Sequence, residues 1–289
     1  MAEYKGIKGF KVQSLASDPT ADEGQIWYNT TSNTLKYDTV AAGTWASGGA
    51  IGTARYADGG AVSDLNTART YLAGCGTQTA ALAFGGNVPS PVYAITENWN
   101  GTAWTEVGDL NTARRRLGGC GITTAALCVN GGPPGDSFRL AEDYNGTAWT
   151  EVADPTNGRQ KPFTAKNGTP TAALVFGGGP PTIALTESFD GTSWTETGDL
   201  GTARYAGGGA GTQTDALCIG GGTAPARSKT ESFDGTSWTE ENDLGTARYE
   251  NTGSSGTGSL AFTAGGQQSP GTITEEWTKA ATVKTVTTS

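Results

Sequence analysis

Residues 199–238 read DLGTARYAGGGAGTQTDALCIGGGTAPARSKTESFDGTSW, and this stretch decides the fold because the chain repeats it. Its arginine recurs at intervals of 45 residues, and once of 44, at Arg69, Arg114, Arg159, Arg204 and Arg248. A tryptophan follows the same spacing at Trp104, Trp149, Trp194 and Trp238. Five copies, beginning near residues 64, 111, 156, 201 and 245, therefore run to residue 277. A period of this length is typical of propeller blades.

Each copy predicts four short strands and no helix. The apolar run at 216–221 ends in two glycines and is too short for a helix, so it is typical of a buried strand. The pair Asp190-Gly191 favours a tight hairpin between the third and fourth strands. A single such sheet cannot bury both of its faces, whereas sheets stacked radially can. The sequence therefore predicts an all-β propeller with four antiparallel strands in each blade.

The chain ends carry a further strand pattern. Gln25–Asn29 and Thr34–Asp38 flank a turn, and Trp45 follows them, so residues 25–46 resemble the last three strands of another blade. The β-prone segment Thr282–Thr288 could supply the missing strand. We expect six blades, with five as the alternative, in a ring closed by mixing N- and C-terminal strands. The expected division is an N-terminal docking extension over residues 1–24 and a propeller over residues 25–289.

Composition excludes several classes of function. The chain has 289 residues and no histidine, which removes the commonest general base and every histidine-containing metal site. A net charge of −9 argues against nucleic-acid binding, which needs a basic face. No apolar run reaches the roughly 18 residues that a spanning helix needs, and the first residues lack the apolar core of a signal peptide. We expect no cofactor, no metal, no nucleic acid, no membrane insertion and synthesis in a cytoplasm.

The four cysteines form no Cys-x-x-Cys pair, which excludes a zinc ribbon or a redox motif of that type. They occupy two places in the repeat that elsewhere hold small residues such as Ala165 and Ala210. We therefore predict small buried residues with free thiols rather than disulfides. These cysteines are Cys75, Cys120, Cys128 and Cys218.

The repeat has an arginine before its first strand, a glycine pair after its second, and an aromatic residue and a tryptophan downstream. This pattern closely resembles the kelch motif over about three quarters of the chain. In kelch adaptors that bind acidic peptides, an arginine in this place contacts the ligand. The resemblance thus implies ligand binding, to a carboxylate or sulfate, by Arg69, Arg114, Arg159, Arg204 and Arg248. The alternative is structural: each arginine pairs with the aspartate five residues before it, as Asp109 precedes Arg114.

Residues 24–37, GQIWYNTTSNTLKY, resemble a motif common in tail-fibre and other virion proteins of bacteriophages. Glycine-, threonine- and asparagine-rich repeats of this near-identical kind are likewise similar to those of marine phage structural proteins. The resemblance implies a virion protein that is made in the host cytoplasm, is present in multiple copies and contacts other tail proteins.

The segments between the second and third strands vary most among the copies: 87–91, 133–139, 179–182, 223–229 and 267–271. Variation on a fixed scaffold is typical of recognition loops, and we select Tyr93, Phe138 and Arg227 as contact residues. We expect a non-enzymatic, tail-associated binding propeller that contacts virion proteins and a host-surface glycan or protein. One alternative is an intracellular kelch module that binds an acidic peptide. A carbohydrate-active enzyme is less favoured, because carboxylate pairs such as Glu187 and Glu196 recur in every blade, whereas a catalytic site breaks the symmetry of its repeats.

Overall fold

The structure is a computed structural model that describes residues 13–16, 26–32, 34–40, 44–47, 65–88, 90–133, 138–222, 228–250, 253–266, 273–279 and 281–285. Two compact units share the chain. The larger unit comprises residues 44–278, and the smaller one joins residues 1–43 to residues 279–289. Across the described residues no helix is long and apolar enough to cross a membrane.

The larger unit consists of five four-stranded antiparallel sheets. The first contains β5 (Ala73–Thr77), β6 (Ala80–Phe84), β7 (Thr96–Trp99) and β8 (Trp104–Glu106). The second contains β9 (Gly118–Ile122), β10 (Ala125–Val129), β11 (Ala141–Tyr144) and β12 (Trp149–Val152). The third contains β13 (Phe163–Thr164), β14 (Ala173–Phe176), β15 (Thr186–Phe189) and β16 (Trp194–Thr197).

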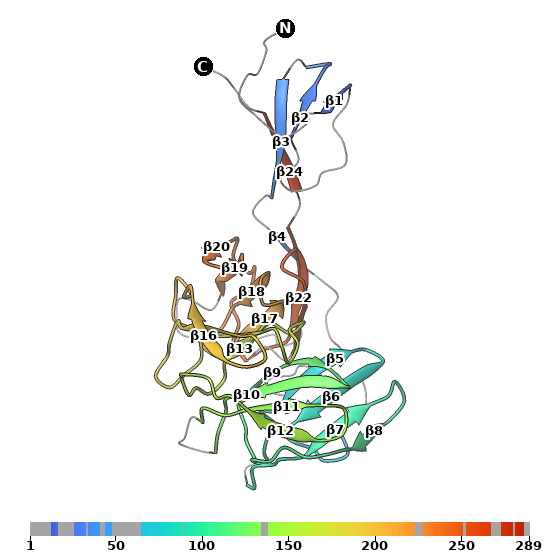
Figure 1. Cartoon of the computed structure of the whole chain (residues 1–289), viewed down its shortest axis with the longest axis vertical. Helices are drawn as coiled ribbons and strands as arrows, with labels where there is room; N and C mark the ends of the chain where they lie inside the picture. Colours follow the sequence, from blue (N-terminus) through green and yellow to red (C-terminus); the bar gives the residue numbers. More distant parts are fainter. Residues whose placement is uncertain are drawn as a thin grey trace. The chain divides into compact units, whose positions relative to one another are not determined.

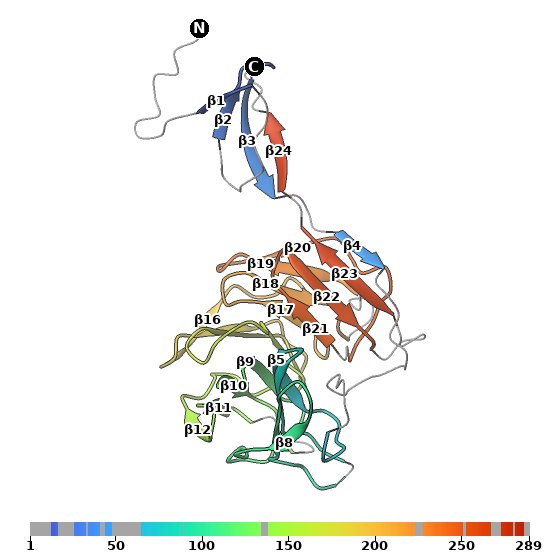
Figure 2. The same cartoon turned by 90° about the vertical axis from the view of Figure 1, so that its right-hand side faces the viewer.

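The fourth sheet contains β17 (Gly208–Gly211), β18 (Ala216–Ile219), β19 (Thr230–Phe233) and β20 (Trp238–Glu240). The fifth joins β21 (Gly253–Gly256), β22 (Leu260–Ala264) and β23 (Thr274–Thr278) to β4 (Thr44–Ser47), side by side in Figure 2. The first strands of successive sheets contact one another, from β5 through β9, β13 and β17 to β21. Figure 1 shows β9, β13 and β17 together at the middle of this unit. The predicted all-β propeller with four-stranded blades is confirmed.

The expected number of six blades was wrong, and the alternative of five is correct. Residues 25–46 do not form one partial blade, because the segment divides between the two units. Trp45 of β4 pairs with Trp277 of β23, just as Trp104 pairs with Trp99 in the first blade. The fifth repeat lacks a hairpin after Trp277, so β4 supplies its fourth strand, and the described strands form no sixth blade.

The predicted N-terminal hairpin is present, but in the smaller unit. Its sheet has the order β1 (Gln13–Leu15), β2 (Ile26–Asn29), β3 (Thr34–Val40) and β24 (Ala281–Thr285), with β1 parallel to β2. The Asn29 side-chain oxygen accepts bonds from the backbone N–H groups of Thr31 and Ser32, each at 3.0 Å. The C-terminal strand therefore pairs with the hairpin as expected, outside any blade.

Small residues on the first strands let neighbouring blades approach closely. A Cβ at Gly119 would lie 2.4 Å from Phe84 Cζ, and one at Gly209 would lie 2.2 Å from the Thr164 carbonyl oxygen. Aromatic packing continues the interface outward, where the rings of Phe84 and Trp149 from adjacent blades are 4.9 Å apart. A Cβ at either position would force its neighbour to shift, so glycine is favoured at both.

All four cysteines are free, as predicted. Burial of their thiols is the main cause that raises the pKa of each to about 12. They therefore behave as small packing residues, because the reactive thiolate is suppressed at neutral pH.

Candidate functional site

The five repeated arginines are buried, with 5% of Arg69 exposed and 1% or less of each of the others. Each pairs with a glutamate on the third strand of its own blade, and the Nη2–Oε1 distance is 2.7 Å in two of these pairs, those of Arg114 and Arg204. We call each pair a clamp. The clamps are Arg69–Glu97, Arg114–Glu142, Arg159–Glu187, Arg204–Glu231 and Arg248–Glu275.

Each clamp connects three parts of its blade, and the second blade illustrates how. Arg114 Nη1 donates to the carbonyl oxygens of Asn130 and Leu140, both at 3.0 Å. These two residues flank the variable segment 133–139, so the guanidinium holds the base of that loop. The other carboxylate oxygen, Glu142 Oε2, accepts the backbone N–H of Asn111 at 2.6 Å. The same carbonyl contacts recur in the third, fourth and fifth blades.

The expected pairing of each arginine with the aspartate five residues earlier was wrong where the structure describes that aspartate. Asp109 Oδ1 instead accepts the backbone N–H of Thr96 at 3.0 Å; the first of the series, Asp64, lies outside the described residues. Ligand contact by the five arginines stays a prediction. In this structure their charged groups are enclosed and bonded to their own blades, a geometry that assigns them to the scaffold.

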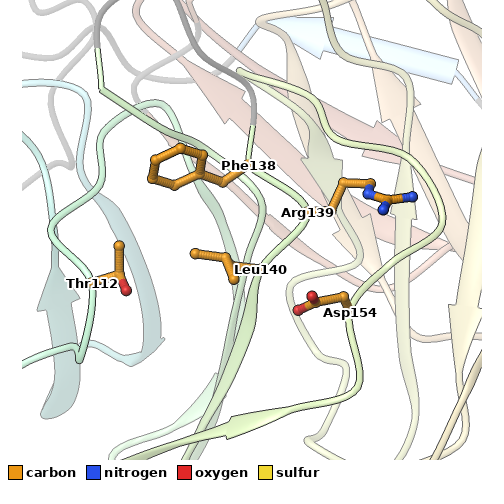
Figure 3. Close-up of a pocket in the computed structure, with 5 residues that line it drawn as sticks. All are labelled: Thr112, Phe138, Arg139, Leu140 and Asp154. Atoms are coloured by element: carbon orange, nitrogen blue, oxygen red, sulfur yellow. The ribbon is translucent and has the colours of Figure 1, made fainter.

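The three predicted contact residues have different outcomes. Phe138 lines a pocket of about 490 Å³ together with Thr112, Arg139, Leu140 and Asp154. Figure 3 shows Phe138 and Leu140 between Thr112 on one side and Arg139 and Asp154 on the other. Tyr93 is half-buried, and its carbonyl oxygen accepts the backbone N–H of Arg114 at 3.2 Å. Arg227 lies outside the described residues.

A second group of side chains, which the repeat pattern did not predict, lies just before the first strands. The second residue after each clamp arginine has a left-handed backbone, with φ between 48° and 56°. Backbone hydrogen bonds pass from one of these residues to the next: Arg116 donates to Tyr71 at 2.8 Å, Lys161 to Arg116 at 2.7 Å, and Ala206 to Lys161 at 3.1 Å. Because non-glycine residues rarely adopt this conformation, these bonds must hold it in place.

We call the side chains around this hydrogen-bonded chain the rim cluster, which comprises Tyr71, Arg115, Arg116, Gln160, Lys161, Tyr205 and Glu250. Two cations face the Tyr71 ring closely, with the Arg116 guanidinium carbon at 4.8 Å and Lys161 Nζ at 5.3 Å from its centroid. The guanidinium carbon of Arg115 is 6.0 Å from the same centroid. Lys161 also forms an ion pair with Glu250, and Arg116 Nη1 donates to Gln160 Oε1 at 3.0 Å.

The rim cluster lies at the same end of the blades as the variable loops. In an antiparallel pair the first strand begins where the second ends, and isolated bridges join Thr70 to Asn87 and Arg115 to Gly132 at the loop bases. The rim cluster is locally positive, because it has three cations and one carboxylate. Burial, together with the nearby charge of Arg116, lowers the pKa of Arg115. The signal was present in the sequence, because no two copies have the same pair of residues after the repeated arginine.

Among the described residues no group of three or more acidic or cysteine side chains is placed to hold a metal ion. No protein-family model matches the chain. No curated protein matches it either.

The fold itself has a structural counterpart. The chain is similar to the solved structure described as "Structure of YjhT", with a TM-score of 0.60 and 11% sequence identity. The similarity covers 75% of this chain and 84% of that one. At this level of identity the likeness shows a shared fold alone, and the propeller class therefore rests on architecture rather than on relatedness.

Proposed function

We propose that this protein is a non-enzymatic binding propeller of a bacteriophage particle, attached to the tail through other virion proteins and presenting its variable face to the host surface. The observation that carries the binding role is the contrast between clamps and loops. Each blade has the same buried Arg–Glu pair, whereas the loops rooted on these pairs differ in sequence. A constant scaffold with a variable face is the arrangement typical of recognition proteins.

The virion assignment rests on the resemblance of residues 24–37 to the tail-fibre motif. Those residues overlap the hairpin of the smaller unit, and that unit is the part proposed to dock on other tail proteins. Such a protein is made in the host cytoplasm, functions in the virion and is present there in several copies.

Two measurements test this proposal. Mass spectrometry of purified particles should detect the chain, and the purified chain should bind the bacterial cells that the phage infects. Replacing Phe138 and Arg139 by serine removes two side chains of the variable face and should weaken cell binding. The matched control replaces Thr147 and Ala148 by serine, since these exposed residues lie on the hairpin at the opposite end of the same blade. Absence from particles together with absence of cell binding would overturn the proposal.

The alternative is an intracellular kelch-type module that binds an acidic peptide. The positive rim cluster is the observation that favours an acidic ligand for it. If the rim cluster contacts such a peptide, a pull-down should be abolished by Arg115→Gln combined with Lys161→Gln, with folding checked by circular dichroism.

A carbohydrate-active enzyme has less support. The pair Glu187 and Glu196 lies on directly opposed positions of β15 and β16. Glu187 is the buried partner of Arg159, so it is committed to the scaffold. The equivalent pairs of the first, second and fourth blades include a clamp glutamate in the same way.

A further inference from the structure

The rim cluster has a surplus of positive charge on an acidic protein. Arg115, Arg116 and Lys161 come from two adjacent blades and converge on the ring of Tyr71 from a third. Glu250 is the one acidic member of the cluster and is paired with Lys161. The chain as a whole carries a net charge of −9, so a local excess of cations is not a consequence of composition. Cations held together in this way repel one another unless an anion lies between them.

Arg115 is the member of the cluster whose charge the fold does not use. Arg116 is bonded to Gln160, and Lys161 to Glu250. By contrast, the Arg115 guanidinium has no hydrogen bond or ion pair among the described residues; its Nε is buried without a partner, as is that of Arg116. The terminal nitrogens of this guanidinium can therefore donate to a bound anion.

The repeat gives an internal comparison for this position. The residue directly after the clamp arginine is Thr70, Arg115, Gln160, Tyr205 or Tyr249 in the five blades. The backbones of Thr70 and Arg115 make equivalent bridges to the loop base, so this position contributes to the scaffold through its backbone. The guanidinium of Arg115 is therefore available for a function beyond folding.

From this geometry we infer that the rim cluster binds the carboxylate of an acidic sugar, with Arg115 as its principal ligand. A guanidinium presents paired N–H donors that match a carboxylate. The neutral members of the cluster favour a sugar over an acidic peptide. The half-buried Tyr71 and Tyr205 provide hydroxyl groups suited to sugar hydroxyls, whereas an extended peptide would need backbone partners along a groove. This inference deepens the proposed function, because it names a ligand class for the same face.

Isothermal titration of the purified chain at low ionic strength tests the site directly. D-glucuronate is the probe, and D-glucose is its uncharged counterpart. We expect saturable binding of glucuronate, none of glucose, and weakening by added salt. Arg115→Gln should reduce the affinity about tenfold or more, the effect of losing a charged hydrogen-bond donor. Lys279→Gln is the matched control, since it removes one positive charge outside the rim cluster and the variable loops and should change the affinity less than twofold.

Three results would overturn the inference: no saturable binding of glucuronate by the parent chain, equal affinity in Arg115→Gln, or binding of acetate or an acidic peptide as tightly as glucuronate. Equal melting temperatures of Arg115→Gln and the parent chain would exclude misfolding as the cause of lost binding. Failure of this titration is distinguishable from failure of the proposed function, because cell binding through the variable loops and detection in particles do not require the rim cluster.

Discussion

Replacing Arg114 by methionine is the sharpest test of the clamp. The substitution keeps much of the side-chain volume but leaves the Glu142 carboxylate, which is 2% exposed, without its cation. Breaking a buried pair in this way costs about 3–5 kcal/mol. The carbonyl oxygens of Asn130 and Leu140 also lose a donor, at about 1 kcal/mol each. We therefore expect the free energy of unfolding to fall by at least about 4 kcal/mol.

Adding Glu142→Leu to Arg114→Met should restore part of that stability. The double variant removes the isolated buried charge and leaves the backbone N–H of Asn111 and the two loop carbonyls without partners. Neutral groups of this kind cost less than an unpaired charge. We expect the double variant to be more stable than Arg114→Met by at least about 1 kcal/mol.

Urea unfolding followed by tryptophan fluorescence, together with calorimetry, measures both effects. A loss of about 4 kcal/mol corresponds to a fall in Tm of roughly 8–16 °C for a chain of this size. Hydrogen exchange should also quicken around Asn130 and Leu140, because Arg114 donates to the carbonyl oxygens of both. The exposed Arg139→Met in the same blade is the control, with an expected change within about 0.5 kcal/mol. A fall in Tm below about 3 °C for Arg114→Met, or a double variant less stable than the single one, would refute the reasoning.

Three further predictions follow from packing and from titratable groups. Gly119→Ala should lower the free energy of unfolding, measured by calorimetry, by about 1–3 kcal/mol, because the new Cβ would lie 2.4 Å from Phe84. Gly222→Ala is the control, since the nearest atom to its Cβ would be 3.5 Å away and no such loss is expected. Equal melting temperatures of the two variants would contradict this prediction. Burial raises the pKa of all four thiols to about 12, and Cys120, Cys128 and Cys218 are also inaccessible. A thiol reagent at about pH 8 should label these three slowly in the folded chain, the half-buried Cys75 faster than they are, and all four rapidly in denaturant. Rapid labelling of Cys120, Cys128 or Cys218 in the folded chain would count against their burial. Hydrogen bonds from backbone N–H groups lower the pKa of Asp190 in the folded chain. Its carboxylate therefore stabilises the turn at pH values above the pKa of this group in the unfolded chain, and that stability is lost as the pH falls through the folded-state pKa. Asp190→Asn, which gives the residue that the first blade has at Asn100, should remove this acid sensitivity. An NMR titration that places the pKa of Asp190 at or above its ordinary value would disprove the last prediction.

The repeat made most of the propeller predictable. Strand number, strand order within a blade and the tight turns all follow from signals inside one copy, such as the Asp190-Gly191 pair. The number of blades did not follow, because it depends on how the two ends of the chain pair, and such long-range pairing has no local signal. A clue existed in the aromatic pairs, since Trp45 completes with Trp277 the pattern that Trp104 makes with Trp99.

The site was less predictable for two physical reasons. The clamp partner lies 27 or 28 residues after its arginine, and only the sheet register brings the two together, so the nearer aspartates were a misleading choice. The glutamates nevertheless recur with the period of the arginines, and that match could have identified the pair. The rim cluster was missed because it lies where the repeat varies, at positions such as Arg115 and Lys161.

The pairing of β4 with β23 has a consequence for how this protein is made. The strand β4, which completes the last blade, precedes every repeat in the sequence. It is therefore synthesised early and remains unpaired until β23 has been made. The final blade can form only after nearly the whole chain has emerged, and until then the outer edge of β23 has no strand beside it. Shortening the chain past residue 44 would leave that edge open permanently and invite assembly with neighbouring copies.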